Sequence, residues 1–329
     1  MSTRSYDDWT QFVWALEAII KKHGIDIAPH SACETAALSL IEMNEVREGR
    51  TCHDPRTDHR ELWSRALSFG DLAEKIVLAR NRPGFERLIP HLKLLAGASD
   101  LSQFSVTNRE NQDNNKAFEL YVGTMALQVL DDCEFDHPEV SEGDNPDIIG
   151  SFAGHRWAIA CKAMHTRNPK TFADRVAEGV EQIQRSGAER GFVMVNMKNT
   201  VDHRRYWPAM RDPDSGEFVY CAFPSLDSAR ARIVAEYESF HRDLAEQFGG
   251  IENFFRSIFV GKKASPHVLL VYSTVTGYET GVGPAFTMLR TMYGIYGPPD
   301  AETEHLVESL NNALHNAADS PVVRAQEIK

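Results

Sequence analysis

The sequence has few cysteines, no long hydrophobic run and no overall positive charge. The five cysteines are scattered, odd in number and never spaced as CxxC; they are Cys33, Cys52, Cys133, Cys161 and Cys221. This pattern argues against a disulfide framework and a zinc ribbon and predicts buried free thiols. No apolar run approaches the roughly 18 residues that span a bilayer, and the N-terminal stretch has no apolar signal core. We therefore expect a cytoplasmic protein with no membrane partner.

The net charge of −12 at pH 7 disfavours coating of nucleic acid by the whole surface. The charge is uneven, because the stretch from Lys162 to Arg211 contains ten Lys and Arg residues but five Asp and Glu residues. A basic stretch of this kind suits a groove that binds phosphates. A solvated helix face explains the same composition, so both interpretations stay open.

Residues 1–100 show apolar side chains at helical spacing and no convincing strand alternation. One segment opens with Ser31 and Glu34, which have the spacing of a capping box. Pro90 is expected to kink the last helix of this part. The polar stretch 98–115 is typical of a loop or boundary. The sequence thus predicts an all-helical accessory domain over 1–100 and a second domain over 101–329.

The segment 114–197 predicts a helix, three strands, a helix and a strand, in that order. The first three strands are short runs between turn residues, at 133–140, 145–152 and 156–164, and the fourth lies at 191–197. The final helix–strand pair implies a crossover connection. We therefore expect an α/β (α+β) fold, in which a central mixed β-sheet is flanked by helices.

The remainder of the chain gives a weaker pattern. Helices are predicted up to about residue 260, followed by a buried strand at about 266–275 that completes the sheet, and by a terminal helix. The stretch 207–225 is predicted to be irregular, and the Gly-rich stretch 278–299 is ambiguous.

The predicted hairpin brings two chemically useful residues together. With a turn near Phe152–Gly154, Asp147 lies level with roughly Ala160. Lys162 points to the same side as Ala160, because side chains along a strand repeat every second residue. A carboxylate and an ammonium group therefore reach one spot. Phosphodiester hydrolysis needs such a pair, since carboxylate oxygens bind Mg²⁺ and a basic group must lie near the attacking water.

Two flanking helices carry further candidates. Glu119 has mostly apolar neighbours, so its carboxylate needs a partner, either a metal ion or a salt bridge. On the helix after Lys162, Glu178 and Gln182 are four residues apart and share a face distinct from the apolar stripe. That face either overlooks the end of the hairpin or is simply solvated.

These residues and their order resemble the PD-(D/E)xK nucleases, which include many restriction endonucleases, Holliday-junction resolvases and repair nucleases. The resemblance covers about 114–197, near a quarter of the chain, and rests on "NPD" ending at Asp147 and "ACK" ending at Lys162. It implies a restriction-endonuclease-like core with its active site at the hairpin. The implied activity is metal-dependent hydrolysis of nucleic acid, of DNA in preference to RNA.

The resemblance also implies a role for each residue. Asp147 and Glu119 would bind Mg²⁺ or Mn²⁺, together with the backbone carbonyl of Cys161. Lys162 would orient the attacking water or stabilise the developing charge, and Gln182 would be the polar residue that many members carry on the second helix. By analogy, we expect a role in defence against foreign DNA, alongside a protein partner or a second copy of the chain.

The sequence departs from the family pattern at Ala160, where the family has Asp or Glu. Three explanations stay open. The acid has migrated to the second helix, as Glu178 or Glu181; the chain is a descendant that only binds nucleic acid; or the acid was replaced recently or deliberately. The otherwise intact strand pattern of "WAIACKA" favours the last explanation, in which one carboxylate is lost and the fold is unchanged.

Two other functions stay open, a non-catalytic nucleic-acid-binding protein and a protein-interaction subunit, both on the same fold. Tyr206 and Trp207 adjoin Arg204 and Arg205, and this aromatic–basic cluster could stack on bases. A surface loop is the alternative interpretation of the same residues.

Overall fold

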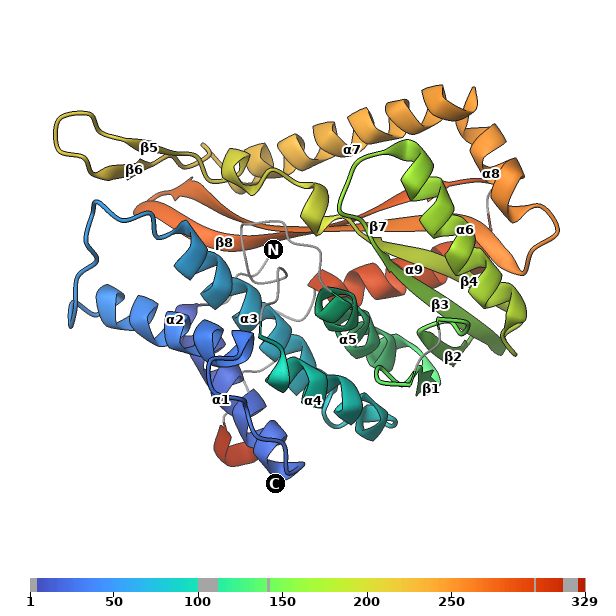
Figure 1. Ribbon diagram of the computed structural model, residues 1–329, viewed down its shortest axis with the longest axis horizontal. Coiled ribbons are helices and arrows are strands. Elements are labelled where there is room, and N and C mark those ends of the chain that lie inside the picture. Colours follow the sequence, from blue (N-terminus) through green and yellow to red (C-terminus); the bar gives the residue numbers. More distant parts are fainter. Residues whose placement is uncertain (1–4, 100–111, 141–142, 299, 316–324, 329) are drawn as a thin grey trace.

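The chain folds into a six-stranded mixed β-sheet with helices on both faces (Figure 1). The structure is a computed structural model and describes residues 5–99, 112–140, 143–298, 300–315 and 325–328. Residues 100–111 of the boundary loop expected at 98–115 lie outside the described residues, and 112–115 belong to a helix instead of a loop.

The N-terminal part is helical, as the sequence predicts. It contains α1 (Tyr6–Lys22), α2 (Ala32–Arg47), α3 (Arg60–Ala79), the 3-10 helix η1 (Phe85–Leu88) and α4 (Ile89–Gly97). Ser31 caps α2 by accepting a hydrogen bond from the backbone of Glu34. Pro90 lies in the first turn of α4, which follows η1 directly, and a missing N–H is tolerated there; the expected kink was wrong because Pro90 begins the helix instead of interrupting it.

The middle of the chain has the predicted order of elements. It contains α5 (Gln112–Val129), β1 (Asp131–Phe135), β2 (Ile148–Phe152), β3 (His155–Ala163), α6 (Pro169–Arg185) and β4 (Arg190–Asn196). β1, β2 and β3 form an antiparallel meander, and β3 pairs in parallel with β4. Positive φ angles at Ala153 and Gly154 give the two-residue turn of a type I′ hairpin between β2 and β3.

The C-terminal part completes the sheet. It contains α7 (Leu226–Phe248), α8 (Ile251–Phe259), β7 (Ala264–Thr280), β8 (Gly283–Tyr296), α9 (Ala301–His315) and the short η6 (Ala325–Glu327). The strand order is β1-β2-β3-β4-β7-β8. The strand expected at 266–275 is the middle of the longer β7, and the ambiguous Gly-rich stretch contains β8. The stretch 207–225 is not wholly irregular, because β5 (Ala209–Arg211) and β6 (Phe218–Tyr220) form a small hairpin.

Alternate residues of the sheet pack into two hydrophobic clusters, one on each face. On β3, Trp157 and Ile159 belong to the cluster formed with α1–α5 and α9, whereas Ala158 and Ala160 belong to the cluster formed with α6–α8. This alternation is the period of two expected for a strand covered on both faces. Lys162 continues the second set, so its side chain lies on the α6 face, as predicted.

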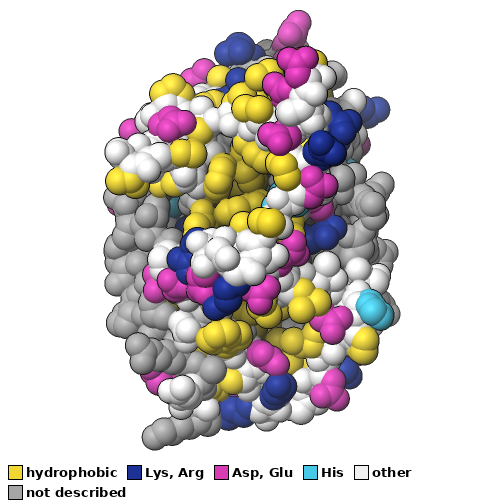
Figure 2. Space-filling view, turned by 90° about the vertical axis from the view of Figure 1, so that its left-hand side faces the viewer, with side chains coloured by type: hydrophobic (Ala, Val, Ile, Leu, Met, Phe, Trp, Pro, Cys, Tyr) yellow, Lys and Arg dark blue, Asp and Glu magenta, His cyan; other side chains and the backbone are white. Residues whose placement is uncertain are grey.

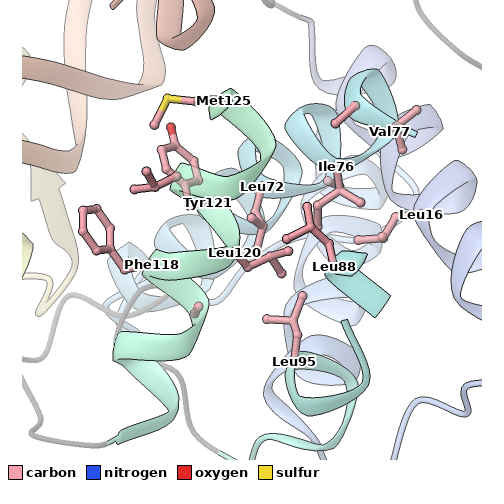
Figure 3. Packing of buried hydrophobic residues seen from close by; sticks show 14 of the residues in the cluster. Leu16, Leu72, Ile76, Val77, Leu88, Leu95, Phe118, Leu120, Tyr121 and Met125 are labelled. Carbon is pink, nitrogen blue, oxygen red and sulfur yellow. The ribbon is translucent and has the colours of Figure 1, made fainter. Parts of the chain in front are cut away.

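Helix α5 joins the N-terminal helices to the sheet. Figure 3 shows Leu120 of α5 among Leu72, Leu88 and Leu95, whereas Phe118 points away from them. Residues of α1, α3, α4, α5 and the sheet all belong to one buried cluster. The helical part predicted over 1–100 therefore shares its core with the sheet.

The cysteines are only partly as predicted. Cys33, Cys133 and Cys161 are buried free thiols, but Cys52 is exposed and Cys221 is half-buried. The prediction was wrong for these two because each lies in a connection, Cys52 before α3 and Cys221 just after β6. In the described part of the chain, no helix is long and apolar enough to cross a membrane.

Candidate active site

The β2–β3 hairpin brings Asp147 and Lys162 to the same end of the sheet. Its register places Asp147 level with Ala160, as predicted. Asp147 accepts a hydrogen bond from the backbone N–H of Cys161, with 2.6 Å between Oδ2 and N. Because a residue in a strand directs its N–H and C=O to the same neighbour, the Cys161 carbonyl also faces the Asp147 side of β3.

Gln182 of α6 fixes the Lys162 ammonium group. Lys162 Nζ donates to Gln182 Oε1 across 2.5 Å, and Gln182 Nε2 donates to the carbonyl of Gly143 across 2.6 Å. Gln182 is buried and overlooks the end of the hairpin, whereas Glu178, which was predicted on the same face of α6, is exposed. The positive charge of Lys162 also reaches Asp147, whose pKa it lowers. Among the described residues no ion pair joins Lys162 to Asp147, so Lys162 acts on Asp147 through its charge and not through a direct contact.

Glu119 of α5 is the second buried carboxylate of the site. Its Oε2 accepts a hydrogen bond from Lys116 Nζ at 2.8 Å and lies 3.5 Å from His91 Nε2. Burial by itself would raise the pKa of Glu119, but the His91 hydrogen bond and the Lys116 charge outweigh it and hold the pKa below its usual value. Glu119 is therefore ionised at neutral pH. Lys116 and His91 are the salt-bridge partners that the burial of Glu119 requires.

Asp147 is in the opposite electrostatic situation. Burial, followed by the negative charge of Glu119, raises the pKa of Asp147 to about 7. The charge of Lys162 and the Cys161 N–H oppose this rise without cancelling it. Asp147 is therefore partly protonated near neutral pH. A cation bound by both carboxylates would favour the ionised form of Asp147.

The donors present at the site fit a hard divalent cation that keeps several of its waters. Asp147 and Glu119 supply carboxylate oxygens, and the Cys161 carbonyl adds a third oxygen, which is the kind of set that Mg²⁺ accepts. Among the described residues, no group of three or more His, Cys, Asp and Glu side chains is arranged to hold a metal ion. The Cys161 thiol itself is buried, which raises its pKa and keeps it protonated.

Ala160 is fully buried against α6, in the hydrophobic cluster of that face. A methyl group at Gly179 of α6 would stand 3.3 Å from the Ala160 Cβ and 3.0 Å from Val193 Cγ2. The helix therefore packs closely on β3 because both positions are small. The residues around Ala160 thus pack closely against a small side chain. This packing argues against the explanation that an acid at position 160 was replaced recently while the packing stayed the same.

The acids proposed as migrated ligands are engaged in other ion pairs. Glu178 is exposed and pairs with Arg175 across 2.9 Å. Glu181 pairs with Lys262 across 2.5 Å. These pairs account for both carboxylates, so the described residues give no support to a migrated acid on α6.

Three residues of the site were not identified from the sequence, namely His91, Lys116 and Asp136. Asp136 follows β1 and donates its N–H to the Asp147 carbonyl across 2.9 Å, while its buried Oδ2 has no hydrogen-bond partner among the described residues. The i,i+3 spacing of Lys116 and Glu119 is a local signal that could have identified the lysine. His91 comes from α4, and no local pattern links it to the hairpin.

The aromatic–basic cluster is not a base-stacking surface. Tyr206 and Trp207 are buried, at 0% and 3% exposure, whereas Arg204 and Arg205 are exposed. The Trp207 ring packs 4.5 Å from the ring of Phe286 in the core under the β7–β8 hairpin. The stacking prediction was wrong because both rings are buried in the hydrophobic core and cannot contact a base.

Among the described residues at the end of the molecule that carries the β5–β6 hairpin, basic side chains form no continuous patch (Figure 2). Basic and acidic side chains are interspersed there around hydrophobic ones.

A separate cavity of about 600 Å³ lies between α8 and the start of β7, and its lining includes Phe255, Phe259 and Tyr296 but none of the candidate site residues.

Comparisons with known proteins found no matching family model, no matching curated protein and no matching solved structure.

Proposed function

We propose that this protein is a metal-dependent nuclease with a restriction-endonuclease-like core, and that DNA is its preferred substrate over RNA. The observation that supports the proposal most is the placement of Asp147 and Lys162 at one end of the sheet, on neighbouring segments, with the Lys162 charge acting on Asp147. The order α5–β1–β2–β3–α6–β4 supports it, because this is the order that the resemblance implies.

Each residue has a specific role in the proposal. Asp147, Glu119 and the Cys161 carbonyl hold Mg²⁺ or Mn²⁺, which when bound neutralises phosphate charge and lowers the pKa of a coordinated water. Lys162 supplies a positive charge beside Asp147, for the charge that develops on the phosphate. Gln182 positions Lys162 through its side-chain carbonyl. Cytoplasmic location, a protein partner or second copy, and a role in defence against foreign DNA are further parts of this proposal.

The missing acid at position 160 makes an informative test. Cleavage of plasmid, linear and single-stranded DNA would be compared for the wild type and the Ala160→Glu variant, with and without Mn²⁺. Cleavage by the wild type in Mn²⁺ supports a site that works with Asp147 and Glu119. Cleavage by the variant alone indicates an inactivated nuclease.

A second candidate function is a non-catalytic nucleic-acid-binding protein on the same fold. The close packing of Ala160 against Gly179 favours it, because this packing leaves no evident room for the family's second carboxylate. It predicts no cleavage by either protein above, and DNA binding that needs no divalent ion and survives Lys162→Ala. Binding measured at low salt, where phosphate contacts are strongest, separates the two functions.

A further inference from the structure

Lys116 lies among three carboxylates at the candidate site. Its Nζ donates to Glu119 Oε2 at 2.8 Å, and its side chain is 19% exposed. Burial lowers the pKa of Lys116, but the negative charges of Glu119, Asp147 and Asp136 outweigh burial and raise it. Lys116 therefore stays charged and is attracted to all three acids.

The acids around Lys116 come from separate elements that converge here. Glu119 lies one turn further along α5, Asp136 follows β1, and Asp147 precedes β2. Asp136 and Asp147 are tied together by the hydrogen bond from the Asp136 N–H to the Asp147 carbonyl. Within the part of the chain that the structure describes, the buried Asp136 Oδ2 has no hydrogen-bond partner, so this cluster has unused acceptor capacity there.

We propose that Lys116 is a tethered cation, which balances these carboxylates in the metal-free protein and leaves Glu119 when a divalent ion binds. The inference rests on the proposed function, because it takes Asp147 and Glu119 as the metal ligands. An ammonium group and a metal ion compete for the same carboxylate, and each repels the other. Lys116 has a flexible four-carbon stem and partial access to solvent, so it can move outward without disturbing α5.

Removal of the Lys116 charge should therefore strengthen cation binding. A unit charge a few ångströms from a divalent ion at the edge of a protein costs enough to change affinity by about tenfold or more. We expect Lys116→Met to bind Mn²⁺ about tenfold more tightly than the wild type. Lys116→Gln should also bind more tightly, because it removes the charge but keeps a hydrogen-bond donor for Glu119.

The experiment is a Mn²⁺ titration of the full-length protein, with free Mn²⁺ measured by electron paramagnetic resonance. The matched control is Lys93→Met, which removes an exposed lysine on α4. Circular dichroism verifies that each variant is folded, and the two different substitutions at position 116 keep the test usable if one of them is not.

Tighter binding by the position 116 variants, with Lys93→Met unchanged, supports the tethered cation. Equal or weaker binding by these variants, when the wild type binds Mn²⁺, overturns the role of Lys116 and leaves the metal site intact. Absence of Mn²⁺ binding by every protein up to about 10 mM, well above the range of ordinary divalent-metal sites, overturns both the tethered cation and the metal-dependent function.

Discussion

The Asp147 carboxylate is anchored to the neighbouring strand, because it accepts the backbone N–H of Cys161 across 2.6 Å. This hydrogen bond fixes the orientation of the one acid that the hairpin contributes to the site. It also keeps that acid buried, next to the negative charge of Glu119. The result is a carboxylate that is well positioned but electrostatically costly in the metal-free protein.

The first prediction concerns the pH dependence of stability. Burial and the charge of Glu119 raise the pKa of Asp147 to about 7, so the folded state holds this proton where the unfolded state has lost it. The contribution of Asp147 to stability is therefore greatest below the unfolded pKa and declines as pH rises toward the folded pKa. Asp147→Asn should remove this decline, because Asn carries no charge.

Urea unfolding at about pH 5.5 and about pH 8 measures the effect. The stability of Asp147→Asn relative to wild type should increase by about 2 kcal/mol between these two pH values. Asp144→Asn, on an exposed residue of the same loop, is the control and should show no such increase. A constant difference between Asp147→Asn and wild type would contradict the electrostatic account of the site.

The second prediction concerns the contact between Gln182 and Lys162. Gln182→Leu removes the acceptor for the ammonium group and should destabilise the protein by about 1 kcal/mol. If cleavage depends on the position of Lys162, its rate should fall by about tenfold or more, in line with loss of a positioned group. Gln182→Glu keeps an acceptor and should retain more of the rate than Gln182→Leu does. Equal rates for the two variants would exclude a positioning role.

The third prediction concerns the close contact of β3 with α6. Ala160→Glu inserts a long, charged side chain into the buried hydrophobic cluster between β3 and α6, so we expect a loss of about 1–3 kcal/mol in the free energy of unfolding. Gly179→Ala should also be destabilising, because its methyl group would stand close to Val193 and Ala160. Ala163→Glu, the same change at the partly exposed end of β3, is the control. Wild-type stability in Ala160→Glu would show that the strand can accept the family's carboxylate.

The fourth prediction concerns a buried charge network between α3, α5 and β8. Asp71 accepts hydrogen bonds from Lys75 Nζ at 2.9 Å, from Tyr121 Oη at 3.0 Å and from Arg290. Asp71→Asn removes the negative charge beside two buried cations and should cost about 3–5 kcal/mol.

Because the helical part and the sheet share one core, near- and far-ultraviolet circular dichroism should report a single urea transition. Two separate transitions would show that these parts unfold independently.

The hairpin residues could be placed from the sequence because the relevant rules are local. A two-residue turn and the period of two fix Asp147, Ala160 and Lys162 relative to one another, and the structure has this register. The apolar stripe of α6 likewise places Gln182 away from the hydrophobic cluster. The order of elements over 114–197 follows from the same local patterns, but the first strand, predicted at 133–140, lies at 131–135.

The remaining features depend on contacts between distant segments. His91 reaches Glu119 from α4, and nothing in the sequence near either residue indicates this pairing. β8 is Gly-rich and weakly patterned, and its long register with β7 supplies the hydrogen bonds that define it. The sequence around Tyr206 and Trp207 suggested a surface segment, but both side chains are buried in the core beside β7 and β8. The tight contact of Ala160 with Gly179 is likewise a tertiary feature.

The central claim is tested most directly by Mn²⁺-dependent cleavage of DNA by Asp147→Asn and Lys162→Met beside two matched controls. Asp144→Asn and Lys170→Met change exposed residues of the same types near the same elements. The account predicts cleavage by the wild type and both controls, and a loss of about a hundredfold or more in Asp147→Asn and Lys162→Met. Cleavage that is equally fast in all five proteins, or absent from both the wild type and Ala160→Glu, would contradict it.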